Sequence, residues 1–84
     1  MMTRDKYELV KRSIRECLEG RPDTHDSLKD CASRKLEGKL DGRISWYVDA
    51  VKADLEIRGA LKRHIGTHPQ VVEWMGDQAQ PDDT

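Results

Sequence analysis

The sequence predicts a single α+β domain, mostly α, in which three helices precede a C-terminal β-hairpin. Apolar residues recur at helical spacing in three segments, each of which ends at a glycine. Two short segments rich in strand-forming residues follow the third helical segment, and the loop-forming run "GTHP" separates them. At 84 residues, the chain is long enough for only one such domain.

The first predicted helix begins after Thr3, whose hydroxyl is suited to cap it, and carries Asp5 in its first turn. Gly20 and Pro22 end this helix, because glycine favours a helix terminus and proline cannot continue the helix. Its inner face is predicted to contain Tyr7, Val10, Ile14, Cys17 and Leu18.

The second predicted helix begins at Thr24, with Asp26 in its first turn, and ends at Gly38. Residues 38–44 contain two glycines and alternating charges, which indicates a short connector to the next helix. The inner face of this helix is predicted to contain Leu28, Ala32 and Leu36.

The third predicted helix has Ser45 as its N-terminal cap and continues to about Arg58. Gly59 is expected to adopt the left-handed conformation just beyond the end of the helix. The helical spacing predicts an inner face of Val48, Val51 and Leu55, with Tyr47 and Arg58 at its edge.

The hairpin is predicted from two runs, "ALKRHI" and "QVVEW". In the first run, Leu61, Arg63 and Ile65 are expected on one face and Lys62 and His64 on the other. The domain is expected to comprise residues 1–76. Residues 77–84 are polar and acidic and are expected to form a flexible tail.

This order of elements is that of a winged helix-turn-helix domain, in which the hairpin is the wing. Residues 7–74 look like a winged helix, and "WYVDAVKADLEIRGAL" resembles the signature of a small uncharacterised bacterial winged-helix-like family. The resemblance implies a fold and brings no catalytic residues. It depends on Trp46, Val48, Val51, Asp54, Leu55, Glu56 and Gly59.

The outer side of the third helix carries a second apolar stripe, spaced i, i+4, i+7 and i+11: Trp46, Ala50, Ala53 and Ile57. Asp49 and Glu56 flank this stripe. Base edges are read by Arg, Lys, Asn or Gln, so the stripe favours contact with protein over direct base reading. In the alternative interpretation the stripe is structural: the alanines only stabilise the helix, Trp46 folds over the connector, and Ile57 lies under the second strand.

Basic residues form two groups that are candidates for contact with the phosphate backbone of nucleic acid. One group lies at the end of the second helix and in the connector: Arg34, Lys35, Lys39 and Arg43. The other lies on the hairpin and its loop: Lys62, Arg63, His64 and His68. Acidic residues are interleaved with the first group, so a solvated face of mixed charge is the alternative interpretation.

The net charge is -1, and the three aspartates of residues 77–84 leave 15 basic against 13 acidic side chains in the rest of the chain. Such a balance excludes a whole-molecule field that would attract nucleic acid. Leu, Val and Ile together number 16, and Phe is absent, so the core is thin. Burial against a partner is therefore an expected source of additional stability.

The first ten residues and the two cysteines indicate the cellular compartment of the protein. Charged residues occupy the segment where a secretory leader needs an apolar core, and no apolar run is long enough to span a bilayer. We therefore expect a cytoplasmic protein with reduced cysteines and no membrane partner. Cys17 is expected to be a small core residue.

Metal and catalytic motifs are not found. His64 and His68 have an H-x3-H spacing, but Cys17 and Cys31 are too far apart to form the cysteine pair of a zinc finger. The sequence contains no nucleophile motif, glycine-rich phosphate loop or H-E-x-x-H motif. We therefore expect no enzymatic activity, no cofactor and no metal.

These observations give two hypotheses about function. The first is a binding module that associates with protein, or with itself as a homodimer, through the outer stripe of the third helix. The second is a DNA-binding regulator that contacts the phosphate backbone through the wing and the basic connector.

Overall fold

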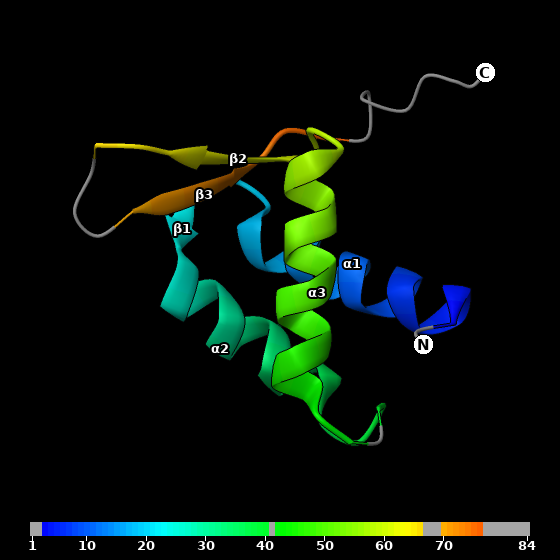
Figure 1. The fold of residues 1–84 in the computed structure, drawn as a ribbon. Coiled ribbons are helices and arrows are strands. Elements are labelled where there is room, and N and C mark those ends of the chain that lie inside the picture. The colour runs from blue at the N-terminus through cyan, green and yellow to red at the C-terminus, as the bar shows by residue number, and fades with distance from the viewer. Residues whose placement is uncertain (1–2, 41, 67–69, 77–84) are drawn as a thin grey trace.

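The computed structural model describes residues 3–40, 42–66 and 70–76. Within them, the element order is α1 (Arg4–Leu18), β1 (Asp23–Thr24), α2 (His25–Leu36), α3 (Ile44–Ile57), β2 (Leu61–His64) and β3 (Val71–Trp74). The helices pack around one core, and the small sheet lies at the C-terminal end of α3 (Figure 1). The predicted α+β fold with three helices and a hairpin is therefore present. The predicted tail, residues 77–84, lies outside the described residues.

The first two helices begin at the predicted caps. The backbone N–H of Lys6 donates to the Thr3 hydroxyl at 3.2 Å, and that of Ser27 donates to the Thr24 hydroxyl at the same distance. Each hydroxyl satisfies an N–H that has no partner within its helix. Asp23 adds a second constraint at the start of α2, because its carboxylate accepts from the Ser27 hydroxyl at 2.7 Å.

The predicted N-terminal cap of the third helix is wrong. α3 begins at Ile44, Arg43 occupies the cap position without a side-chain cap hydrogen bond, and Ser45 lies inside the first turn. Ile44 packs against the core, and the helix starts two residues earlier than expected. The predicted end is confirmed: Gly59 has a φ of +83°, its N–H donates to the Glu56 carbonyl, and the Ala60 N–H donates to the Leu55 carbonyl.

The sheet is antiparallel and has the order β1-β3-β2. β2 and β3 form the predicted hairpin, with Leu61 opposite Trp74 and His64 opposite Val71. Ile65 was expected on the same face of the strand as Leu61 and Arg63, but β2 ends at His64 and Ile65 is 86% exposed beyond it. The sequence did not predict β1, which consists of two residues paired with β3.

The core contains side chains from all three helices and from the hairpin. The inner faces predicted for the helices are confirmed, since their aliphatic side chains are at most 2% exposed. Burial of this apolar surface is the main favourable contribution to the stability of the fold. The buried apolar residues are Val10, Ile14, Leu18, Leu28, Ala32, Leu36, Val48, Val51, Leu55, Ala60, Leu61 and Val72.

Cys17 and Cys31 form a disulfide that joins the last turn of α1 to α2, with their Cα atoms 6.1 Å apart. The expectation of reduced cysteines is therefore wrong. Cys17 does pack against the core, as predicted for its position on α1, but it does so as half of a cross-link. Without free thiols, the cysteines no longer support the prediction of a cytoplasmic location.

Candidate functional site

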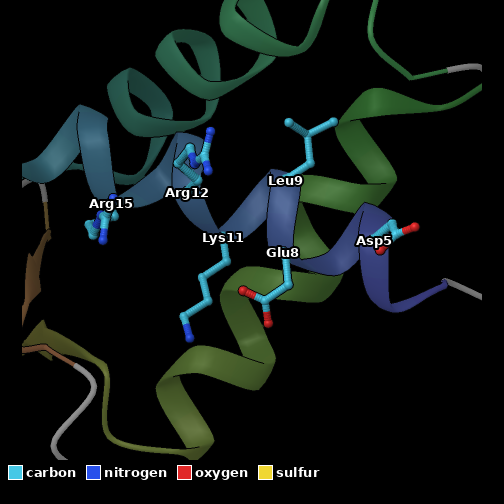
Figure 2. Close-up of a pocket in the computed structure, with 6 residues that line it drawn as sticks. All are labelled: Asp5, Glu8, Leu9, Lys11, Arg12 and Arg15. Atoms are coloured by element: carbon cyan, nitrogen blue, oxygen red, sulfur yellow. The ribbon is translucent and has the colours of Figure 1, made fainter.

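A depression of about 380 Å³ lies along the outer surface of α1. Figure 2 shows its lining side chains spreading in different directions, with Leu9 and Arg12 on one side of the helix and Glu8 and Lys11 on another. A ligand site requires a few polar groups that converge on one point. This depression has no such convergence, so it is a weak candidate.

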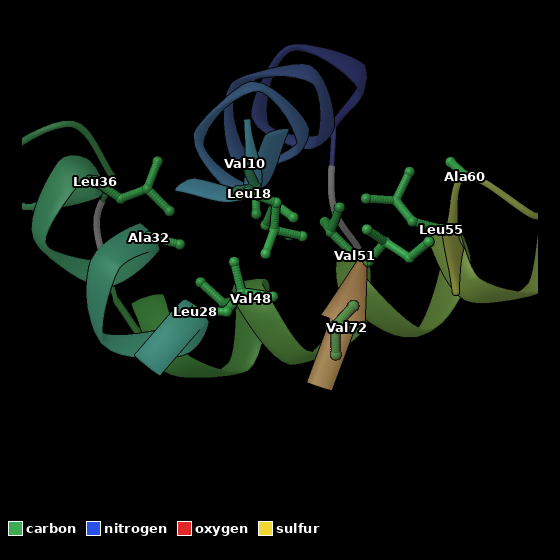
Figure 3. Close-up of a cluster of buried hydrophobic side chains, with 12 residues drawn as sticks. Val10, Leu18, Leu28, Ala32, Leu36, Val48, Val51, Leu55, Ala60 and Val72 are labelled. Atoms are coloured by element: carbon green, nitrogen blue, oxygen red, sulfur yellow. The ribbon is translucent and has the colours of Figure 1, made fainter. Parts of the chain in front are cut away.

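α3 presents one face to the core and another to solvent. Val48, Val51 and Leu55 point into the interior that α1, α2 and β3 also line (Figure 3). With 14 residues the helix is about 21 Å long, so its outer face forms an extended surface.

The outer stripe of α3 comprises Trp46, Ala50, Ala53 and Ile57. Trp46 is 51% exposed, Ile57 is 84% exposed, Ala53 is exposed and Ala50 is half-buried. The indole of Trp46 packs edge-on against Tyr47, with ring centroids 5.3 Å apart. These four residues therefore form an accessible apolar stripe with a large side chain at each end.

The carboxylates that flank the stripe have cationic partners. Asp49 pairs with Lys29 of α2 at 2.9 Å. Glu56 pairs with Lys52 at 2.7 Å and with Arg63 of β2 at 3.0 Å. The flanks of the stripe are therefore closer to neutral than the sequence alone indicated.

The structure does not bring the two candidate basic groups together. Lys39 and Arg43 lie in the connector at the start of α3, whereas the hairpin lies at the other end of the helix (Figure 1). Several members of both groups pair with carboxylates: Arg34 with Asp30, Lys35 with Glu16, Arg63 with Glu56, and His64 with Glu73. These pairs weaken the case for a continuous basic surface. His68 lies outside the described residues.

A charged cluster lies at the junction of α3 and β2, formed by Lys52, Glu56 and Arg63. Lys52 is only 6% exposed, and its ammonium donates to the Glu56 carboxylate. Burial alone would raise the pKa of Glu56, but the hydrogen bonds and positive charges of Lys52 and Arg63 together lower that pKa below its ordinary value. Glu56 is therefore ionised, as a buried ammonium requires of its partner.

Residues 1–72 match the Family of unknown function (DUF6958). The chain belongs to this family. Membership agrees with the resemblance to a small uncharacterised family and adds no activity or ligand. Comparison with curated proteins and with solved structures gives no match.

For this member of the family, sequence reasoning missed the charged cluster. Lys52 is next to Val51 on α3, and a lysine there is ordinarily expected to be solvated. The i, i+4 spacing of Lys52 and Glu56 was a usable signal for their ion pair. No signal in the sequence indicated the third member, because Arg63 pairs with Glu56 only when the hairpin folds back along α3.

Tyr7 and Asp54 form another contact that the spacing on α1 and α3 did not predict. The Tyr7 hydroxyl donates to the Asp54 carboxylate, which also accepts from Arg58 at 2.7 Å. Burial, the hydrogen bond to Asp54 and the negative charge of Asp54 raise the pKa of Tyr7. The phenol therefore stays protonated and ties α1 to the end of α3.

Acid is expected to destabilise the fold through Glu56. The pKa of Glu56 is lower in the folded state than its ordinary value of 4.5, so its ion pairs stabilise the fold above that pH. The stabilisation is lost as the pH falls through the lowered pKa. We expect Glu56→Gln to reduce the loss of unfolding free energy between about pH 6 and about pH 3.5, measured by urea denaturation.

The matched control is Glu37→Gln, which removes a carboxylate that is exposed. Glu37→Gln should leave the pH dependence close to that of the unmodified chain. Equal effects of the two substitutions would show that Glu56 has no special role in acid stability.

In residues 3–40, 42–66 and 70–76, no group of three or more His, Cys, Asp or Glu side chains is arranged to hold a metal ion. Among the same residues, no helix combines the length and the apolar character needed to cross a bilayer.

Proposed function

We propose that the chain is a non-enzymatic binding module of the winged-helix type, which associates with a second copy of itself or with another protein through the outer stripe of α3. The winged-helix arrangement is supported by the hairpin that directly follows the third helix and by the short strand β1 beside β3. It is also supported by the resemblance of residues 7–74 to such domains.

The observation that carries this proposal is the exposed stripe on α3. A tryptophan and an isoleucine are 51% and 84% exposed at its two ends, and two alanines lie between them. Tryptophan is enriched at the energetic centres of protein interfaces. Alanine allows another backbone to approach closely, so a second helix has room to pack along the stripe.

The same stripe is a poor reader of base pairs. Specific contacts to base edges require donors and acceptors such as those of Arg, Asn and Gln. Trp46, Ala50, Ala53 and Ile57 offer one indole N–H and otherwise only apolar groups. Association with protein is therefore the better use of this surface.

Ala53→Glu is expected to weaken self-association at least about tenfold, because a carboxylate buried in an apolar interface loses its hydration. Ala53 is exposed in the monomer, so the substitution should leave the isolated fold intact. Light scattering at several concentrations measures association, and circular dichroism checks the fold.

The matched control is Lys39→Gln, which makes the same change in net charge at an exposed site away from the stripe. It should leave the dissociation constant unchanged. A chain that remains monomeric at high micromolar concentration would rule out the homodimer and leave only docking on another protein. Equal effects of the two substitutions would rule out the stripe.

DNA binding through backbone contacts is a second candidate. Lys39, Arg43 and Lys62 are exposed, and no ion pair to them is seen within the described residues. This function predicts salt-sensitive duplex binding that is lost when Lys39, Arg43 and Arg63 are changed together to Gln. A mobility-shift titration on random duplex tests it, and no shift at low salt would exclude it.

A further inference from the structure

The hairpin and the start of α2 lie close together beside α3 (Figure 1). Residues from these elements line an open groove of about 290 Å³. Its lining combines one apolar side chain with four polar or charged ones that come from three parts of the fold: His25, Lys52, Arg63, Gln70 and Val72. The depression on α1 is lined by one helix, whereas hydrogen-bond donors from several elements line this groove.

The hairpin register places Arg63 at this groove. Arg63 pairs with Val72, which is 1% exposed and belongs to the core, so Arg63 shares the inner face of the sheet. Side chains alternate along a strand, so Lys62 and His64 belong to the opposite face. Two neighbouring cations on β2 therefore have different surroundings.

The charges at the groove do not balance. Lys52 and Arg63 are two cations, and both pair with the single carboxylate of Glu56. Lys52 is 94% buried, since only 6% of it is exposed, so solvent screens its charge poorly. Two cations against one carboxylate leave these three side chains with a net charge of +1; Glu56 is the partner of buried Lys52, so the excess lies on the half-exposed Arg63.

The start of α2 contributes a hydrogen-bond donor to the groove, and the carboxylates of Asp23 and Asp26 at this end of the helix do not line it. His25 is the first residue of α2, where the helix dipole is positive and where a ring N–H is available as a donor. Asp23, the carboxylate just before this helix, is already engaged by the Ser27 hydroxyl and the Thr24 N–H.

We infer that this groove binds a phosphate group. A phosphate carries up to two negative charges and accepts hydrogen bonds on several sides, which matches donors from α2, α3, β2 and Gln70, the residue before β3. The Arg63 guanidinium forms paired hydrogen bonds to such an anion, and Lys52 supplies a fixed charge at the base of the groove. This site is separate from the outer stripe of α3 and does not depend on the role proposed for that stripe.

Inorganic phosphate is the probe for the test, with the full chain in buffers of equal ionic strength set by chloride. We expect saturable changes in the backbone amide NMR signals of His25, Lys52, Arg63 and Gln70 at millimolar phosphate, and none with chloride alone. Arg63→Gln should weaken binding by about tenfold, the expected loss for one charge-assisted hydrogen bond. Arg63 is half exposed, so the fold should tolerate this change.

Two further variants make the test specific. Lys62→Gln removes the same charge from the neighbouring position on the other face of β2 and should leave the affinity unchanged. Glu56→Gln removes the competing carboxylate and should tighten binding about tenfold, the opposite direction to a nonspecific loss of structure. Equal weakening by Arg63→Gln and Lys62→Gln, or amide changes that do not saturate, would overturn the site.

Random duplex DNA distinguishes the source of the phosphate. Competition between duplex and inorganic phosphate at the same four amides supports the site and assigns it to the nucleic acid backbone. Saturable phosphate binding without such competition supports the site and assigns it to a small phosphorylated ligand.

Discussion

Leu55→Ala is expected to cost about 2 to 5 kcal/mol of unfolding free energy, the range for a leucine truncated in a packed core. Leu55 is 1% exposed on the inner face of α3 and packs in the cluster that joins the helices to the hairpin. Small domains have total stabilities at the low end of about 5 to 15 kcal/mol. Urea denaturation should therefore show a transition moved to much lower urea or lost altogether.

The matched control is Ile57→Ala, which removes an aliphatic side chain from the same helix. Ile57 is 84% exposed, and alanine is the better helix former, so dilute monomer should lose little or no stability. A loss from Ile57→Ala as large as that from Leu55→Ala would contradict the assignment of inner and outer faces of α3.

Removing the disulfide is the second large effect. The double substitution Cys17→Ser and Cys31→Ser opens a cross-link between residues 14 apart, and closing a loop of that size is worth about 3 kcal/mol. For a domain of this size, the melting temperature should fall on the order of 10 to 25 °C. Thermal unfolding followed by circular dichroism measures the change.

A dithiol reductant gives an independent check of the cross-link. Reduction should lower the melting temperature of the unmodified chain by a similar amount and leave the double variant unaffected. If the unmodified chain melts at the same temperature with and without reductant, the disulfide does not contribute to its stability.

The helices were predictable because each carries a local signal. Thr3 and Thr24 cap their helices through hydrogen bonds within one turn, and the spacing of Leu28, Ala32 and Leu36 specifies a buried face without reference to any other element. The end of α3 was equally local, since Gly59 closes it through bonds to the last turn.

The features that the sequence did not predict depend on how distant segments meet. Cys17 and Cys31 pair because α1 and α2 pack with the Cα atoms of the two cysteines 6.1 Å apart, a separation that a disulfide can span, and residue spacing does not specify that packing. Ser45 had the right chemistry for a cap, but packing of Ile44 against the core decided the start of α3.

The candidate functional sites likewise include features that local spacing predicts and features that depend on contacts between distant segments. The outer stripe of α3 could be read from helical spacing alone. The burial of Lys52 could not be predicted from helical spacing, because this burial requires the hairpin to cover one side of α3. The groove near Lys52 likewise depends on β1 and β3 bringing the start of α2 beside Arg63.

The sheet order β1-β3-β2 has a consequence for synthesis on the ribosome. The strand that is translated last, Val71–Trp74, occupies the middle of the sheet, and the N–H of the next residue, Met75, donates to the Ala60 carbonyl at 2.7 Å. Until that segment leaves the exit tunnel, β1 and β2 have no strand between them and the nascent core lacks Val72. The emerging helices therefore expose apolar surface to chaperones until Val71–Trp74 has emerged.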